Sequence, residues 1–367
     1  MASMAFRVWC AVTAHGFGHF SQMVPILREL ARRQPDLELR LAGSLPPEVI
    51  RRNLGLPFTQ DPVARDVGLV QSSPLTADLP ATAVALDRIY TTWSALLSAE
   101  KQAMSTFAPH LVLANVPYLP LAAAAELDIP SVAVASLSWD LVMAAYFSLE
   151  VPRHRLWWEQ MRRAYGQTTL ALLPTPALLD GPFPRHVVIP PLIEPGTAMT
   201  ARLRQDLHLS PTDQRPLVLV SLGGIPGTDL PFAAMADNQD WLWLLDFDAP
   251  LPADNLVNWQ HLSGKWLFRD LIASVDAVVG KPGYGMSIET VAHGLPFLYV
   301  CRRTFPDEAA ICPWLNHHGR AREITMTAFR NGTWGESLRE LMALPRPLPP
   351  PLDGASVAVG HILNLMR

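Results

Sequence analysis

Cysteine and charge are both scarce in this sequence. Its 367 residues include three cysteines, and only 17% of them are charged, with a formal net charge of −4 at pH 7. Cys10, Cys301 and Cys312 form no CxxC pair, which argues against a disulfide framework or a zinc cluster and favours a reducing compartment. No block of lysine or arginine stands out, so a nucleic-acid partner is not expected.

The sequence also lacks an apolar run long enough to cross a bilayer. Its longest hydrophobic region, residues 119–135, is interrupted by Glu126, Asp128 and Pro130. The apolar residues 6–12 are too few for a membrane span, and no signal-peptidase pattern follows them. We therefore expect a soluble cytoplasmic enzyme, and the length is sufficient for two α/β domains.

A glycine-rich stretch at residues 275–300 is the most informative part of the chain. It reads VDAVVGKPGYGMSIETVAHGLPFLYV, which predicts a buried strand, a glycine loop, a helix and a second strand. A glycine loop that leads into a helix N-terminus binds phosphate, because unpaired N–H groups and the helix dipole favour an anion. Lys281 adds a positive charge there, and Glu289 is placed to accept hydrogen bonds from a ribose diol. The stretch predicts a site for a nucleoside diphosphate, although glycines that merely turn the chain remain an alternative.

A second motif, AHGFGH at residues 14–19, lies between a predicted strand and a predicted helix. A dinucleotide fingerprint is disfavoured, because Ser21 occupies the third glycine position and no acidic residue follows the next strand. His15 and His19 have a spacing compatible with zinc, but the intervening glycines disfavour a helix and no third ligand is evident. Two interpretations remain, which are general-base catalysis by a histidine and simple capping of the helix.

These two motifs together resemble the GT-B glycosyltransferases. The glycine–aromatic–small pattern that leads to Glu289 and GLPF is similar to the donor-binding segment of plant-type UDP-sugar transferases and of lipid-linked N-acetylglucosaminyl transferases. A closer likeness, which extends through residues 301–303 and 306–308, is to the glycosyltransferase-like N-terminal half of plant L-arabinose kinases. Nothing in the chain resembles the kinase half.

The resemblance implies an α/β protein with two Rossmann-like doubly wound domains that face a cleft. The expected parts are an acceptor-side domain at residues 1–185, a linker at 186–198, a donor domain at 199–345, and a proline spacer with a C-terminal helix that crosses back to the first domain at 346–367.

The resemblance also implies roles for particular residues. His19 is the first candidate for the catalytic base and His15 the second, and Asn115 stands where plant-type relatives place a supporting aspartate. The expected donor-binding residues lie at or after the ends of three predicted strands of the second domain: Ser221, Gly223, Gly224, Lys281, Gly283, Tyr284, Gly285, Met286, Ser287, Glu289, Arg303, Asp307 and Glu308.

The sequence therefore predicts an inverting transfer of sugar from a nucleoside-diphosphate sugar, most simply UDP-linked, to an unidentified acceptor hydroxyl. The nucleotide sugar is a co-substrate, and neither a metal nor another cofactor is expected. The acceptor is either a small molecule or a lipid, and the basic aromatic residues 153–163 leave peripheral membrane contact open. Two alternatives are a nucleotide-sugar 2-epimerase and a catalytically degenerate GT-B protein that only binds sugar nucleotides.

Overall fold

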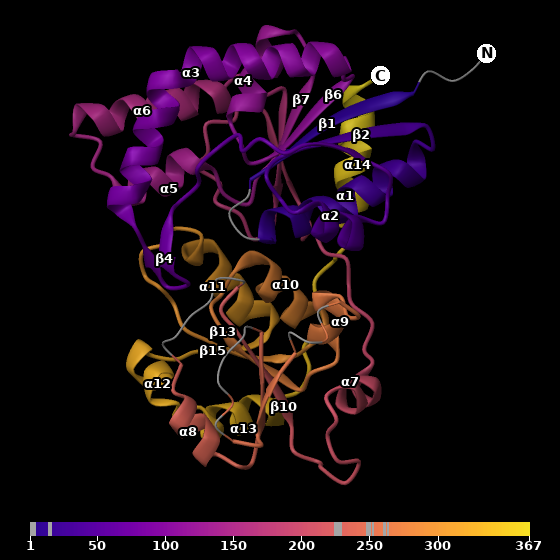
Figure 1. The fold of residues 1–367 in the computed structure, drawn as a ribbon, viewed down its shortest axis with the longest axis vertical. Coiled ribbons are helices and arrows are strands. Elements are labelled where there is room, and N and C mark those ends of the chain that lie inside the picture. Colours follow the sequence, from indigo (N-terminus) through magenta and orange to yellow (C-terminus); the bar gives the residue numbers. More distant parts are fainter. Residues whose placement is uncertain are drawn as a thin grey trace.

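The computed structural model describes residues 5–13, 17–223, 230–246, 251, 253–259, 262 and 264–367. His15 and Gly224, both predicted to be functional, lie outside these residues. Two α/β domains lie one above the other, each built on its own parallel sheet (Figure 1). Within the described ranges no helix is long and apolar enough to pass through a membrane.

The first domain has a seven-stranded parallel sheet in the order β3-β2-β1-β6-β7-β8-β9. Its central strands are apolar on both faces, as expected for parallel strands covered by helices on each side. The sheet strands are β1 (Phe6–Val12), β2 (Leu37–Ala42), β3 (Thr59–Asp61), β6 (Leu111–Asn115), β7 (Ser131–Val134), β8 (Leu170–Pro174) and β9 (His186–Ile189). The helices are α1 (Gly18–Arg33), α2 (Pro47–Leu54), α3 (Leu79–Phe107), α4 (Leu119–Glu126), α5 (Trp139–Tyr146) and α6 (Pro152–Tyr165).

One predicted boundary of this domain needs correction. Strand β9 pairs with β8, so residues 186–189 belong to the first sheet and the linker begins after them. Residues 56–80 contain β3 and a small hairpin of β4 (Gln71–Ser73) and β5 (Thr76–Ala77). These strands are short, and their polar side chains hide the alternation by which a strand is recognised.

The second domain has a six-stranded parallel sheet in the order β12-β11-β10-β13-β14-β15. Its strands are β10 (Leu217–Ser221), β11 (Leu242–Leu245), β12 (Leu256–Asn258), β13 (Ala277–Gly280), β14 (Pro296–Tyr299) and β15 (Arg320–Glu323). The helices from the linker onward are α7 (Thr200–Asp206), α8 (Phe232–Asp237), α9 (Phe268–Ala273), α10 (Tyr284–Ala292), α11 (Glu308–His318), α12 (Met326–Asn331), α13 (Gly335–Ala343) and α14 (Gly354–Leu365). Gly332, with a left-handed φ of 67°, ends α12 and separates it from α13.

Apolar contacts help to join the two domains. Helix α14, at the end of the chain, packs against α1 of the first domain through Ala358, Val359 and Ile362 (Figure 1). Leu75, in the β4–β5 hairpin, packs against the core of the second domain. Phe305, after β14, packs in the core of the first domain. Each domain therefore inserts one apolar side chain into the other.

Candidate functional site

The described parts of the two glycine-containing motifs meet between the domains. Helix α1 starts at Gly18, within the first motif, and α10 starts at Tyr284, within the second. The helices are in contact, and a Cβ added at Gly285 would lie 3.7 Å from Oγ of Ser21. A side chain at Gly283 would meet nothing within 4 Å, so space is left in front of the first turn of α10. The structure thus brings the predicted acceptor side and donor side together.

His19 begins a chain of neutral hydrogen bonds in the first domain. Its Nδ1 lies 2.7 Å from Oδ1 of Asn115, at the end of β6. Nδ2 of Asn115 donates to Oε1 of Gln22 at 3.2 Å, and Nε2 of Gln22 donates to Oγ of Ser136 at 3.3 Å. Because Oδ1 of Asn115 accepts, Nδ1 of His19 carries the proton and Nε2 is left as a proton acceptor.

Burial changes the basicity of this imidazole. His19 is 7% exposed, and its burial lowers the pKa to about 4, while the hydrogen bond with Asn115 opposes the shift. The ring is therefore neutral, and so able to accept a proton, at every pH well above 4. Gln22 and Ser136 were not predicted to belong to the site. The signal for Gln22 was its place three residues after His19, on the same face of the helix.

On the donor side, Lys281 follows β13 at the carboxyl edge of the second sheet. Gly280 lets β13 approach β10, since a Cβ there would lie 2.0 Å from the carbonyl oxygen of Ser221. The Lys281 side chain lies over Gly223, which has φ of 84° and whose added Cβ would be 2.9 Å from Cε of the lysine. Nζ of Lys281 donates to the carbonyl of Pro74, in the hairpin of the first domain, at 3.4 Å. The lysine therefore lies between the domains.

Burial and charged neighbours change the pKa of Lys281. Burial and the nearby positive charge of Arg302 lower the pKa of Lys281 to about 8, although Asp307, Glu308 and Asp246 oppose the shift. Asp246, which follows β11, accepts a hydrogen bond from Oγ of Ser221, and its burial raises its pKa to about 6. Asp246 was missed, because a single aspartate after a strand carries no distinctive pattern.

The segment after β14 changes the expected division of roles. Arg303 was predicted to bind the donor, but its side chain is 75% exposed and pairs with Glu323. The neighbouring Arg302 has a side chain only 6% exposed, bonded to Oε1 of Glu308 at 2.7 Å and 3.5 Å from Oδ1 of Asp307. Arg302, rather than Arg303, is therefore the arginine near Lys281.

Asp307 and Glu308, the residues predicted to bind the donor sugar, also differ in their surroundings. Glu308 uses both carboxylate oxygens to bind Arg302 and the backbone N–H of Arg303, so it holds this loop in place. Oδ1 of Asp307 is buried without a hydrogen bond among the described residues, and burial raises the pKa of Asp307 to about 6. Within the described part of the chain, Oδ1 of Asp307 thus has Arg302 as an ion-pair neighbour but no hydrogen bond, whereas both oxygens of Glu308 are hydrogen-bonded.

The remaining predicted residues lie on α10. The hydroxyl of Tyr284 donates to the carbonyl of Thr175 at 3.2 Å and accepts from the N–H of Leu192 at 3.0 Å, so this side chain joins the domains and does not face a donor. The side chain of Met286 packs against the second core. In the part of the chain that the structure describes, Oγ of Ser287 is buried and unbonded. Glu289 lies 3.5 Å from His293, and burial raises its pKa.

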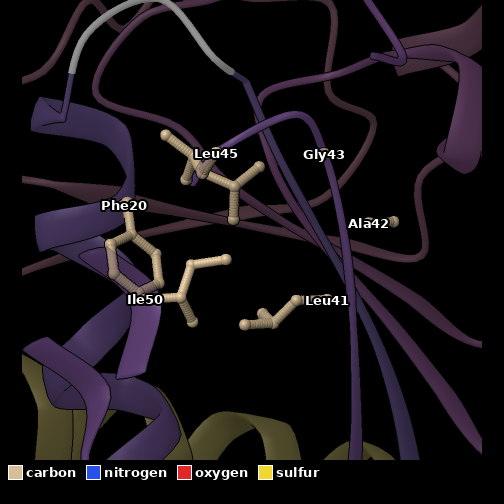
Figure 2. Close-up of a pocket in the computed structure, with 7 residues that line it drawn as sticks. Phe20, Leu41, Ala42, Gly43, Leu45 and Ile50 are labelled. Carbon is tan, nitrogen blue, oxygen red and sulfur yellow. The ribbon is translucent and has the colours of Figure 1, made fainter. Parts of the chain in front are cut away.

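A small apolar cavity lies near the end of β1, but it is not a ligand site. Figure 2 shows that its lining comes from the sheet edge and from α1 and α2. The lining residues are Val12, Phe20, Leu41, Ala42, Gly43, Leu45 and Ile50. Its volume of about 10 Å³ is no more than one water molecule needs, and the apolar walls offer water no partner.

Two cysteines that are distant in sequence also meet in the second domain. The sulfur atoms of Cys301 and Cys312 lie 3.3 Å apart as free thiols. The sequence has no CxxC spacing that would predict this pair, because one cysteine follows β14 and the other lies within α11.

Comparison with known proteins identifies the fold. No family model matches the chain. Its structure is similar to that of the glycotransferase of kitacinnamycin, with a TM-score of 0.64 and 16% identity, covering 99% of this chain and 96% of the other. It is also similar to UDP-GlcNAc 2-epimerase from Neisseria meningitidis bound to UDP-GlcNAc, with a TM-score of 0.60 and 12% identity, covering 98% and 100%. The chain has the GT-B fold, which confirms the prediction from sequence.

A curated relative adds a likeness in sequence. The chain is 26% identical over 357 residues, 96% of its length, to L-arabinokinase of Arabidopsis thaliana. It covers 34% of that protein and so spans about a third of the length of the relative.

Proposed function

We propose that this protein transfers a sugar from a nucleoside-diphosphate sugar, most simply UDP-linked, to a hydroxyl of an acceptor. The observation that carries the proposal is the close approach of the α10 N-terminus, with Lys281 beside it, to the start of α1, with His19. The solved GT-B glycosyltransferases, and the solved GT-B epimerase bound to UDP-GlcNAc, support a nucleotide sugar as the ligand of such a cleft.

In the proposed reaction, Nε2 of His19 takes the proton of the acceptor hydroxyl. The hydroxyl oxygen attacks the anomeric carbon, and the bond to the nucleoside diphosphate breaks on the opposite face, so the configuration inverts. The N–H groups of α10 and the ammonium of Lys281 stabilise the negative charge that develops on the leaving diphosphate. Glu289 is assigned to the ribose and Asp307 to the donor sugar hydroxyls. The proposed reaction requires no metal ion.

A thermal-shift panel of UDP, GDP, dTDP, ADP and NAD tests the proposal first. A nucleotide at about 100 times its dissociation constant stabilises the folded state by roughly 2.7 kcal/mol, a visible rise in melting temperature. We expect one diphosphate to raise it, and Glu289→Ala to abolish the rise. A flat response to all five nucleotides contradicts the proposal.

The likeness to a UDP-GlcNAc 2-epimerase keeps a second function in view. An epimerase releases a sugar isomer from the nucleotide sugar alone, whereas a transferase needs an acceptor. Product analysis without acceptor therefore separates the two. A degenerate protein that only binds the nucleotide predicts donor binding without isomerisation, sugar transfer or donor hydrolysis.

A further inference from the structure

Asp66 is a carboxylate that the catalytic scheme above does not use. It lies between β3 and β4, and its Oδ2 accepts hydrogen bonds from Nε1 of Trp139 at 2.7 Å and from the hydroxyl of Thr13. Among the described residues, nothing donates to Oδ1 of Asp66. Burial raises the pKa of this carboxyl to about 6. One oxygen is thus fixed by the protein, and the other remains available.

The segment that carries Asp66 is firmly held. The preceding residue, Arg65, is 5% exposed and directs its guanidinium to Glu100 at 2.9 Å and to Asp61 at 2.7 Å. This buried network attaches the segment to α3 and to the end of β3. A polar group on such a support keeps a defined position, which is what recognition of a ligand requires.

Asp66 and His19 share a neighbour. The ring of Trp139, whose N–H binds Asp66, has its centroid 6.0 Å from that of His19. Thr13, the second partner of Asp66, donates its backbone N–H to the carbonyl of Asn115 at 2.9 Å. Both functional groups therefore lie at the carboxyl edge of the first sheet, where ligands of α/β proteins bind.

We propose that Asp66 accepts a hydrogen bond from a second hydroxyl of the acceptor, so that the acceptor is a polyol, such as a sugar, rather than a monohydroxy lipid. This inference rests on the proposed function and adds the class of acceptor. In the proposed reaction the reacting hydroxyl of the acceptor donates to His19. A carboxylate only accepts hydrogen bonds, so Asp66 needs a donor, which a second hydroxyl of the same acceptor supplies. A lipid alcohol leaves a partly buried carboxylate without a partner, which disfavours its binding.

The indole N–H of Trp139 gives a direct test, because it donates to the carboxylate in question. In ¹⁵N-labelled protein its resonance is assigned with Trp139→Phe. With UDP present, the protein is titrated with glycerol, D-glucose and D-galactose, and separately with 1-hexanol. We expect a saturable shift of this resonance with at least one polyol and none with hexanol. Glycerol carries the minimal feature, which is two adjacent hydroxyls. The inference is therefore overturned if the polyols cause no shift of this resonance at concentrations up to molar.

The variant Asp66→Asn sharpens the test. Its amide oxygen still accepts from Trp139 and Thr13, but its free end now donates, so polyol affinity should fall at least tenfold while the melting temperature and UDP binding remain. Asp128→Asn, which removes an exposed carboxylate of the same domain outside this network, is the matched control and should retain polyol binding. Equal polyol affinity in Asp66→Asn and the wild type overturns the inference.

The two proposals fail separately. Loss of the UDP response with retained polyol binding removes the donor hypothesis and keeps the subsite. A UDP response without polyol binding removes only the subsite. If sugar transfer is obtained, Asp66→Asn should raise the acceptor KM more than it lowers kcat, whereas donor hydrolysis by water should be unchanged.

Discussion

The two domains differ in their electrostatics where they meet at the candidate site. In the first domain, His19 begins a chain of uncharged hydrogen bonds through Asn115 and Gln22. In the second, Lys281 and Arg302 lie among the carboxylates of Asp246, Asp307 and Glu308. A neutral side suits removal of a proton from an uncharged hydroxyl, and a charged side suits a diphosphate. The difference supports the proposal that proton transfer takes place in one domain and charge stabilisation in the other.

The largest expected effect is on turnover, and it comes from a substitution in the first domain. His19→Ala removes the proposed proton acceptor, and turnover should fall on the order of 10²- to 10⁴-fold, with nucleotide binding retained. The measurement is steady-state transfer alongside a UDP thermal shift. His186→Ala, on β9 at the far edge of the same sheet, is the control and should leave turnover unchanged. Normal turnover in His19→Ala removes it from the mechanism.

The next largest effect is on nucleotide affinity, and it comes from a substitution in the second domain. Lys281→Ala should weaken binding of the diphosphate by roughly 10- to 100-fold, since a hydrogen bond to a charged group contributes about 1.5–3 kcal/mol. Calorimetric titration with UDP measures it, and Lys265→Ala, which removes an exposed lysine, is the matched control. Equal losses in both variants would show that only net charge matters.

The affinity for UDP should also depend on pH through this lysine. The pKa of Lys281 is lowered to about 8, so the ammonium is present below that pH and is lost as the pH rises through it. Binding should therefore weaken between pH 7 and pH 9.5 in the wild type. The same titration of Lys281→Ala should be flat over that interval, and a parallel decline in the variant contradicts the assignment.

A smaller effect is expected when a carboxylate is introduced into the first domain, which makes its charge more like that of the second. Asn115→Asp places a carboxylate against His19, which should raise the pKa of the imidazole by about 1–3 units. The acidic limb of the pH–rate profile, expected near pH 4, should move upward accordingly. Gln22→Glu, one hydrogen bond further away, is the control and should shift it less. An unmoved limb means that His19 does not titrate in the profile.

The smallest effect concerns the connection between the sides. Tyr284→Phe removes the hydroxyl that binds Thr175 and Leu192, leaving the ring in place. The free energy of unfolding should fall by about 1 kcal/mol, with the UDP affinity nearly unchanged. Urea denaturation measures the first quantity and titration the second. A large loss of UDP affinity would return Tyr284 to the donor site.

The sequence by itself determined the two-domain α/β architecture and the position of both motifs. Long apolar runs bounded by glycine and proline predict buried parallel strands, since their pattern is local. His19, Asn115, Ser221 and Lys281 each follow such a strand or begin the helix after it. Their presence at the edge of a sheet is a consequence of that local order.

Only the tertiary structure decided which side chains meet. Neighbours along the chain point in different directions, so Arg302 is buried while Arg303 is exposed. Likewise, Oδ1 of Asp307 has no hydrogen bond from any described residue, while both oxygens of Glu308 are bonded. Gln22, Asp246 and Asp66 acquire their surroundings from segments that are distant in sequence. Burial sets the pKa values of His19 and Lys281, and burial depends on how the helices, sheets and domains pack together.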